Sequence, residues 1–255
     1  MEIYLSKKYE SFKDDIINTI SNFDTYDNSF DTGKRNSIKK VDIKDTTFVI
    51  KSFKKPLLIN QFIYKHIRKS KAKRSFEYAN RLLKLGVKTP PSVAYIENFN
   101  LVGLQNSYYV SEFIPYDITF RTLIDDPNYP DHQTIIEGFT KFTFDLHEKG
   151  VEFLDHSPGN TLIAKKEDQY NFYLVDLNRM KFGELNYEQR LKNFARLTRK
   201  KVLIEKIALA YSVLIRKDAS EVFEKMWSYN EQFHKKFDSE KRLKSILFNR
   251  KYDLK

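Results

Sequence analysis

The segment VEFLDHSPGN, residues 151–160, constrains what this chain can fold into more than any other stretch of its sequence. Asp155 stands five positions before Asn160, Pro158 and Gly159 lie between them, and the apolar run TLIA follows at once. Proline and glycine bend a backbone and Asp and Asn bond within turns, so an ordinary turn is one interpretation. The other is that the turn directs both polar side chains toward one reaction, which requires partner groups elsewhere in the chain.

Three further polar residues occur where such partners are needed. Lys51 lies inside TTFVIKSF (46–53), whose alternation of apolar and polar residues predicts a half-buried strand. Glu77 lies on the helix predicted after it, and Asp176 ends the apolar run NFYLVDL. Phosphoryl transfer needs a lysine for the phosphates, a glutamate to pair with that lysine, an aspartate to accept the hydroxyl proton, and two oxygen ligands for Mg²⁺. The residues therefore favour phosphoryl transfer over a plain turn.

Hydrophobic periodicity predicts an α+β chain with a strand-rich first lobe, residues 1–114, and a helical second lobe, residues 115–255. The segment 115–131 contains three prolines and is interpreted as the connection between the lobes. The expected elements are strands at 46–53, 92–98, 107–114, 161–164 and 171–177, two helical pieces within 57–86, a helix over 131–149, and helices from about 186 onward with Leu203, Ile207, Ala210 and Leu214 as one apolar stripe.

Composition excludes several kinds of chemistry. The 255 residues include no cysteine, which rules out disulfides, thiolate metal sites and cysteine nucleophiles. The sequence contains no apolar run of about 20 residues and no secretory signal pattern, so we expect a cytoplasmic protein. His147 and His156 lack a second pair at ligand spacing, which argues against zinc. His147 is expected to be structural, and His156 has no role that the sequence explains.

The charge is strongly positive, with 45 Lys+Arg against 34 Asp+Glu and a formal net charge of +11. This favours an anionic partner, or it reflects a lysine-rich solvated surface. The run KHIRKSKAKR, residues 65–74, is either a solvated helix face or a contact for an anionic glycolipid or membrane surface. Nearby aromatic residues are expected to face the core, which argues against a nucleic-acid site. These are Phe62, Tyr64, Phe76 and Tyr78.

Longer motifs add a resemblance to a known family. The segment LHEKGVEFLDHSPGNTLI, followed by FYLVDLNRMKFG, resembles the catalytic and metal-binding loops of the protein-kinase-like superfamily. Within it, LDHSPGN and VDLNRM are most similar to the Kdo/WaaP-type lipopolysaccharide kinase family, as is KSKAKRSFEYANRLLKLGVKTPPSVAYIE. The resemblance extends over roughly residues 30–200.

The resemblance implies a two-lobed protein-kinase-like fold, with an antiparallel sheet in the first lobe and helices in the second. It implies ATP and Mg²⁺ as cofactors, and an inner-core sugar hydroxyl, on Kdo or heptose, as acceptor. That acceptor is an anionic glycolipid at the cytoplasmic membrane face. The implied roles are Asp155 as catalytic base, Asn160 and Asp176 as metal ligands, Lys51 on the phosphates and paired with Glu77, and Glu112 and Phe113 within the hinge VSEF that receives adenine.

The chain departs from the kinase pattern in three places. Phe153 replaces the histidine usually found two positions before the base, and no long activation segment follows VDLNRMKFG. Gly33 is the only glycine before Gly86, so phosphate contacts in that loop would rest on Gly33 and Asn36. These departures keep two alternatives open: a kinase of another small molecule or of a protein, and a degenerate kinase that binds nucleotide without catalysis.

Overall fold

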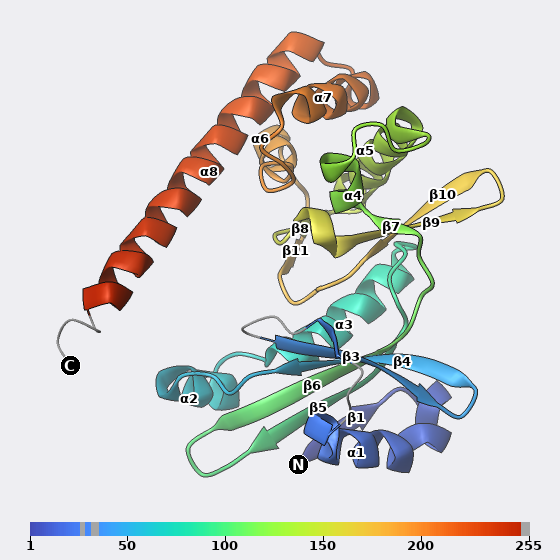
Figure 1. Cartoon of the computed structure of the whole chain (residues 1–255), viewed down its shortest axis with the longest axis vertical. Coiled ribbons are helices and arrows are strands. Elements are labelled where there is room, and N and C mark those ends of the chain that lie inside the picture. Colours follow the sequence, from blue (N-terminus) through green and yellow to red (C-terminus); the bar gives the residue numbers. More distant parts are fainter. Residues whose placement is uncertain (26–28, 32–35, 251–255) are drawn as a thin grey trace. The chain divides into compact units, whose positions relative to one another are not determined.

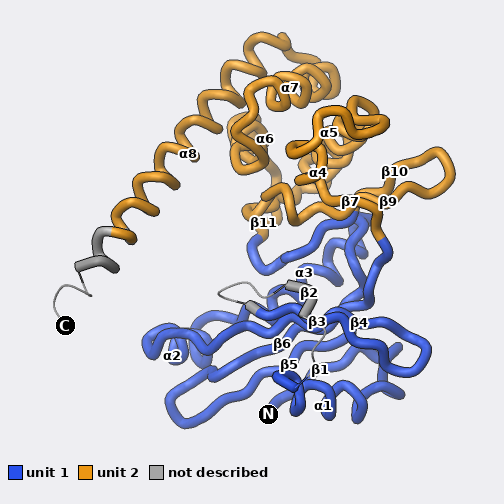
Figure 2. Tube along the Cα trace, in the orientation of Figure 1, with its two compact units in different colours: residues 1–115, 173–179 blue, residues 116–172, 180–255 orange. Residues whose placement is uncertain are grey.

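The computed structural model describes residues 1–25, 29–31 and 36–250, and its contacts divide the chain into two compact units (Figures 1 and 2). Unit 1 is Met1–Pro115 with Tyr173–Arg179, and unit 2 is Tyr116–Phe172 with Met180–Lys255. The sequence predicted one boundary between the lobes, after residue 114, whereas the chain crosses between the units three times. The short segment that carries Asp176 returns to the first unit.

Unit 1 is built on a six-stranded sheet with the order β1-β5-β6-β4-β3-β2, in which every pair of neighbours is antiparallel. The antiparallel sheet expected for the first lobe is confirmed. The strands are β1 (Glu2–Leu5), β2 (Ser29–Asp31), β3 (Asn36–Ile43), β4 (Thr46–Phe53), β5 (Ser92–Phe99) and β6 (Leu104–Glu112), and the helices are η1 (Lys7–Phe12), α1 (Lys13–Ser21), η2 (Phe23–Thr25), α2 (Leu58–His66) and α3 (Lys71–Lys84).

The two faces of this sheet differ because successive side chains of a strand point to opposite sides. Phe48 and Ile50 of β4 are fully buried in a core that also contains Ile16 and Ile20 of α1. Lys51 is consequently on the other face, and the strand predicted over 46–53 is confirmed at both ends. The alternation read from the sequence thus decides on which side of the sheet the lysine lies.

Helix α3 covers the second face, where its Phe76 meets Tyr95 of β5 edge to face at 5.4 Å. Ser70 caps the helix by accepting a hydrogen bond from the Lys73 N–H (3.0 Å), and Gly86 follows it with φ +67°. The prediction of two helical pieces before Gly86 is confirmed. Phe76 is buried as predicted, but the prediction for Phe62 is wrong because 54 % of that residue is exposed.

Unit 2 combines helices with small sheets, β10-β9-β7 and β11-β8. The predicted stripe of α7 is shifted: Leu203 and Ile207 are buried, whereas Ala210 and Leu214 lie at its edge and Tyr211 takes the central place. The elements are β7 (Ile118–Thr119), α4 (Phe120–Asp125), α5 (His132–Glu148), β8 (Val151–Phe153), η3 (Pro158–Asn160), β9 (Thr161–Lys166), β10 (Gln169–Leu174), β11 (Met180–Phe182), α6 (Tyr187–Lys192), α7 (Lys201–Ile215) and α8 (Ala219–Arg250).

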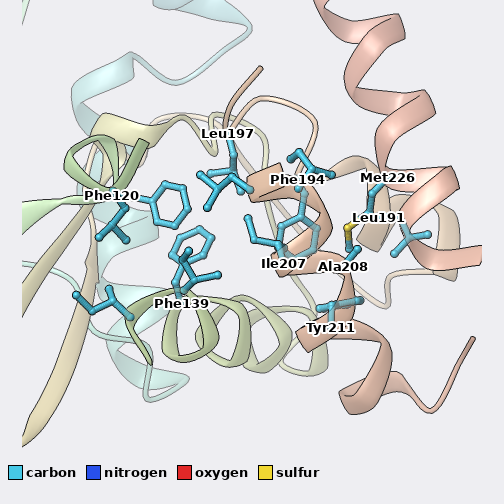
Figure 3. Close-up of a cluster of buried hydrophobic side chains, with 14 of the residues drawn as sticks. Phe120, Phe139, Leu191, Phe194, Leu197, Ile207, Ala208, Tyr211 and Met226 are labelled. Carbon is cyan, nitrogen blue, oxygen red and sulfur yellow. The ribbon is translucent and has the colours of Figure 1, made fainter. Parts of the chain in front are cut away.

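The core of unit 2 joins α4, α5, α7 and the start of α8 (Figure 3). The rings of Phe120 and Phe139 are tilted by 33° with their centroids 4.1 Å apart, and Phe194 meets Tyr211 edge to face at 5.1 Å. This aromatic core lies directly beneath the loop that follows β8, since His156 of that loop packs against Phe139. Among the described residues, no helix is both long enough and apolar enough to cross a membrane.

Candidate active site

Lys51 is held within the sheet of unit 1. It lies opposite Tyr109 of β6, and Tyr109 lies opposite Tyr95 of β5, so all three are on the face that α3 covers. The Lys51 side chain is largely buried, and its Nζ lies 2.6 Å from Oδ1 of Asp176. Burial of a lysine is tolerated when an opposite charge compensates it, and here Asp176 provides that charge.

Asp176 lies two residues beyond the end of β10, in a segment anchored to unit 1. The Leu174 N–H donates to the Lys88 carbonyl (3.1 Å), and the Thr89 hydroxyl donates to the Leu174 carbonyl (2.7 Å). Asp176 itself has φ +58°, a left-handed conformation that Asp and Asn tolerate better than most residues. Such conformations persist where the surroundings enforce them, and they gather at functional sites.

The Asp176 carboxylate is contacted on one side only. Its Oδ1 receives Lys51 and a hydrogen bond of 2.6 Å from the Asn178 amide. In the part of the chain that the structure describes, Oδ2 has no hydrogen-bond partner, and the side chain is 28 % exposed. The protein therefore orients the Asp176 carboxylate through Oδ1, and Oδ2 is left for a ligand.

Glu77 does not pair with Lys51, which corrects the expected ion pair. Its carboxylate accepts two hydrogen bonds of 2.8 Å from Lys69, and Asp176 takes the place beside Lys51. The reason is the phase of α3, in which Phe76 and Ala79 are buried while Glu77 is partly exposed on the flank. One residue turns a helix by about 100°, enough to move a carboxylate away from the sheet.

Two backbone N–H groups of the expected hinge already donate hydrogen bonds to other segments of unit 1. The Glu112 N–H donates to the Pro91 carbonyl and the Phe113 N–H donates to the Thr47 carbonyl, each at 2.9 Å. The Glu112 side chain accepts hydrogen bonds from Lys8 and Tyr9. Burial pushes the pKa of Glu112 upward, but these hydrogen bonds outweigh it and hold the pKa below its ordinary value. Neither N–H group is therefore available to a ligand.

The glycine-poor loop is described only at its end. Gly33 lies outside the described residues. Asn36 is the first residue of β3, where its backbone is opposite Phe53 of β4.

The DHSPGN loop of unit 2 is fixed by bonds to one carbonyl group. The Ser157 N–H (2.7 Å) and the Asn160 side-chain amide (2.9 Å) both donate to the Asp155 carbonyl, and Pro158 begins the short turn η3. The NH₂ group of Asn160 is used in this way, and its Oδ1 accepts no hydrogen bond within the described residues. The turn therefore presents an Asn oxygen and an Asp carboxylate from one rigid unit.

Arg196 holds this loop through two contacts, and nothing in the sequence pattern predicted that role. One guanidinium nitrogen lies 2.9 Å from Asp155 Oδ1, and another donates to the Leu154 carbonyl at 3.2 Å. The guanidinium lies 5.2 Å from the Phe233 ring of α8. A planar, permanently charged group with several donors suits this double contact. Only the fold could reveal it, because residue 196 follows no recognisable spacing from residue 155.

A second support reaches the loop through buried polar groups. The Asn193 amide donates to the Phe153 carbonyl at 2.8 Å, and its oxygen lies 3.2 Å from Nε2 of His147. The other ring nitrogen of His147 lies 2.7 Å from the Tyr211 hydroxyl. The expectation that His147 is structural is confirmed. The backbone carbonyl of Phe153 thus links the loop to Asn193, while the Phe153 ring is buried in the core.

The expected site residues are divided between the units. Lys51, Glu77, Glu112, Phe113 and Asp176 belong to unit 1, and Asp155 and Asn160 belong to unit 2.

Comparisons with known proteins identify the family. The model of the lipopolysaccharide kinase (Kdo/WaaP) family matches residues 30–241. The chain belongs to this family. One similar solved structure is that of WaaP in complex with acyl carrier protein, with 15 % identity and a TM-score of 0.62, covering 92 % of this chain and 99 % of that one. No curated protein sequence matches the chain.

Membership in the lipopolysaccharide kinase family makes the chain an enzyme, a phosphotransferase that uses an alcohol group as acceptor. The structural likeness to WaaP supports the same fold that the resemblance implied, with an antiparallel sheet in one lobe and helices in the other. The two-lobed kinase-like fold predicted from the sequence is confirmed.

The ion pairs of this family member lead to a prediction about two residues. Replacing Lys51 by methionine is expected to lower phosphate transfer by about 10²–10³-fold, since one preorganised charged donor is lost. Replacing Glu77 by glutamine should change it by less than about fivefold, because an exposed ion pair contributes only about 0–1 kcal/mol. Transfer rates of both variants check this. Equal losses would mean that Glu77 is coupled to Lys51 during the reaction.

His156 of this kinase is buried among aromatic rings. Its ring lies within 5.3–6.2 Å of Phe139, Phe153 and Phe194, and neither ring nitrogen has a hydrogen-bond partner in the described structure. Burial lowers its pKa from 6.5 to about 3, and burial lowers that of His147 to about 4. Both rings are therefore neutral supports of the core beneath the loop.

These two histidines predict a loss of stability in acid. Folding lowers both pKa values. Below pH 6.5 the two histidines are therefore protonated in the unfolded chain but remain neutral in the folded chain. Stability then falls with pH by about 1.4 kcal/mol per pH unit for each histidine. Urea unfolding at pH 7.5 and at about pH 5 should show this, and His156→Leu should remove one share of it. An identical pH dependence in the variant would contradict the assignment.

Proposed function

We propose that this kinase transfers the γ-phosphate of ATP, with Mg²⁺, to a hydroxyl of a lipopolysaccharide inner-core sugar, either Kdo or heptose. The observation that carries the proposal is the 2.6 Å pair between Lys51 and Asp176. Phosphoryl transfer relies on a strand lysine that neutralises phosphate charge beside a carboxylate that can hold a metal ion. The family supplies the class of acceptor.

The residues present fit Mg²⁺, which prefers hard oxygen ligands and keeps several waters. Asp176 offers Oδ2, and Asn160 offers Oδ1, since its amide nitrogen already donates to the Asp155 carbonyl. When bound, the metal would neutralise charge on the phosphates. Asn178 and Lys51 keep the Asp176 carboxylate in one orientation, so little rearrangement is needed on binding.

Asp155 is proposed to accept the proton of the acceptor hydroxyl. Arg196 holds its Oδ1 at 2.9 Å, and its backbone carbonyl is fixed by two hydrogen bonds. The Arg196 contact restricts the carboxylate, and the two hydrogen bonds fix the backbone that carries it, which is what positioning catalysis requires. Arg196 and Asn193 act through the loop and are positioning residues.

The hinge is proposed to bind adenine through groups other than the two N–H groups already used. The N–H groups of Glu112 and Phe113 are donated to Pro91 and Thr47. The remaining donor is the N–H of Ile114, for which the described residues provide no acceptor. Adenine recognition would then use this N–H group together with hinge carbonyl oxygens.

The acceptor is proposed to be an anionic glycolipid at the cytoplasmic face of the membrane. The net charge of +11 favours such a partner, and so does the basic run of residues 65–74.

The proposal is tested by transfer of labelled γ-phosphate from ATP and Mg²⁺ to purified lipopolysaccharide core that lacks phosphate. Transfer that Asp155→Ala abolishes is the expected result. Bound ATP without transfer would redirect the assignment to another hydroxylated acceptor. Failure to bind ATP at all would overturn the proposed reaction.

A further inference from the structure

Helix α2 of unit 1 has its polar and apolar sides reversed. In a surface helix the apolar side normally faces the protein. Here the buried residue is Gln61, which is 2 % exposed, whereas the exposed side carries Leu58 (68 %), Ile59 (78 %) and Phe62 (54 %). These three side chains lie within one sector of the helix, because positions i, i+1 and i+4 are neighbours on its surface.

This orientation is enforced by specific contacts. The Gln61 amide donates to the Pro56 carbonyl at 2.8 Å, and its oxygen accepts from the Gln105 amide at 2.9 Å. The Gln61 backbone is so close to Gly103 that a Cβ on that glycine would be 2.3 Å from the Gln61 carbonyl oxygen. A buried, satisfied glutamine cannot be exchanged for the opposite side of the helix without losing these bonds. The apolar side is therefore directed outward by the fold.

The turn between β5 and β6 extends the apolar surface. Lys65 at the end of α2 donates to the carbonyls of Asn100 and Leu101, at 3.3 and 3.2 Å, which joins the turn to the helix (Figure 1). Leu101 is 97 % exposed and Val102 is 49 % exposed. We call the whole surface the α2 face, and it comprises Leu57, Leu58, Ile59, Phe62, Ile67, Leu101 and Val102.

The chain segment that carries the α2 face is rich in cations, of which Lys69 is paired with Glu77 of α3. Residues 54–74, which include α2 and both of its flanks, contain eight lysines and arginines and no aspartate or glutamate. A hollow of about 370 Å³ beside the helix is lined by Lys54, Lys55 and Lys71 together with Tyr64. Such a hollow suits a phosphate group. The surface thus combines protruding apolar side chains with cations at its border.

We propose that the α2 face docks this protein onto a bilayer containing anionic phospholipids. The apolar side chains would enter the interfacial region while the flanking cations meet lipid phosphates. A bilayer fits better than a protein partner because Leu101, which is 97 % exposed, projects singly from a turn, and because the neighbouring cations complement lipid phosphates. The inference does not depend on which acceptor the kinase uses.

The test is flotation of the full-length protein with vesicles of phosphatidylcholine alone or mixed with phosphatidylglycerol, without ATP or lipopolysaccharide. We expect binding to the mixed vesicles and not to the neutral ones. The double variant Ile59→Ser, Phe62→Ser should bind at least about tenfold more weakly, because two apolar side chains no longer leave water. Replacing Lys54 and Lys55 by glutamine should also weaken binding and reduce its sensitivity to salt.

The matched control replaces two equally exposed apolar residues of unit 2. Leu209 (58 %) and Val213 (73 %) lie one turn apart on α7, and their change to serine should leave vesicle binding unchanged. Phosphate transfer to a soluble core fragment should be unaffected by either double variant, which separates this proposal from the assignment of the reaction. Undiminished binding of Ile59→Ser, Phe62→Ser would overturn the proposal. So would capture of an acidic protein through the same face in place of vesicles.

Discussion

Replacing Asp155 by asparagine is expected to lower phosphate transfer by about 10²–10⁴-fold, the usual contribution of a general base. Asparagine keeps the size of the side chain and can still contact Arg196, but it cannot accept the hydroxyl proton. The backbone carbonyl of residue 155, which receives Ser157 and Asn160, is unchanged, so the loop should keep its shape. Steady-state transfer from ATP should therefore show a lower kcat with little change in the KM for ATP.

Asp145→Asn provides the control for that experiment. Asp145 lies on α5 and pairs with Lys141 on the surface of the same unit, at 2.6 Å. Its replacement changes the charge by the same amount without touching the loop. Near-normal transfer by Asp155→Asn, with an unchanged unfolding midpoint, would remove Asp155 from the role of base.

The second large effect is expected for Asp176→Asn, which should lower transfer by at least about 10²–10³-fold. Two effects combine, since the proposed Mg²⁺ would lose an anionic ligand and Lys51 loses the charge that compensates its burial. Asparagine tolerates the left-handed conformation of this position, so the backbone should be retained. The activity that remains should require a higher Mg²⁺ concentration, measured as the Mg²⁺ dependence of kcat.

Asp131→Asn is the matched control, because Asp131 has the same φ of +58°. Its carboxylate pairs with Lys165 and Tyr170 on the surface of unit 2. If both variants lost activity equally, the loss would arise from the backbone conformation or from net charge. If Asp176→Asn kept normal activity and normal Mg²⁺ dependence, the metal-ligand assignment would fail.

Two supports hold the loop that is proposed to be catalytic, at the position where the kinase pattern has a histidine before the base. Phe153 takes that position, and its carbonyl is held by Asn193 while Arg196 holds the next carbonyl and the Asp155 side chain. In the kinase pattern one histidine side chain supports the loop, whereas here Asn193 and Arg196, which follow α6, share that role. Neither can be found by motif, because their function depends on where the chain returns and not on local spacing.

The sequence by itself determined the features that depend on neighbouring residues. The alternation of 46–53 placed Lys51 on the second face of β4, since strand geometry has a period of two. Gly86 ended the helical segment predicted over 57–86, because a left-handed glycine satisfies the end of a helix locally. The motifs around Asp155 and Asp176 indicated the family, because turn residues and reactive groups follow one another directly in the chain.

Only the tertiary structure decided which groups meet. Lys51 pairs with Asp176 instead of Glu77, and Arg196 meets Asp155, because these contacts depend on helix phase and on distant segments packing together. The same holds for α2, where hydrophobicity predicted a buried Phe62. Gln61 takes the inward position through its hydrogen bonds to Pro56 and to Gln105 of β6, and Phe62, the next residue of the helix, is on the outside.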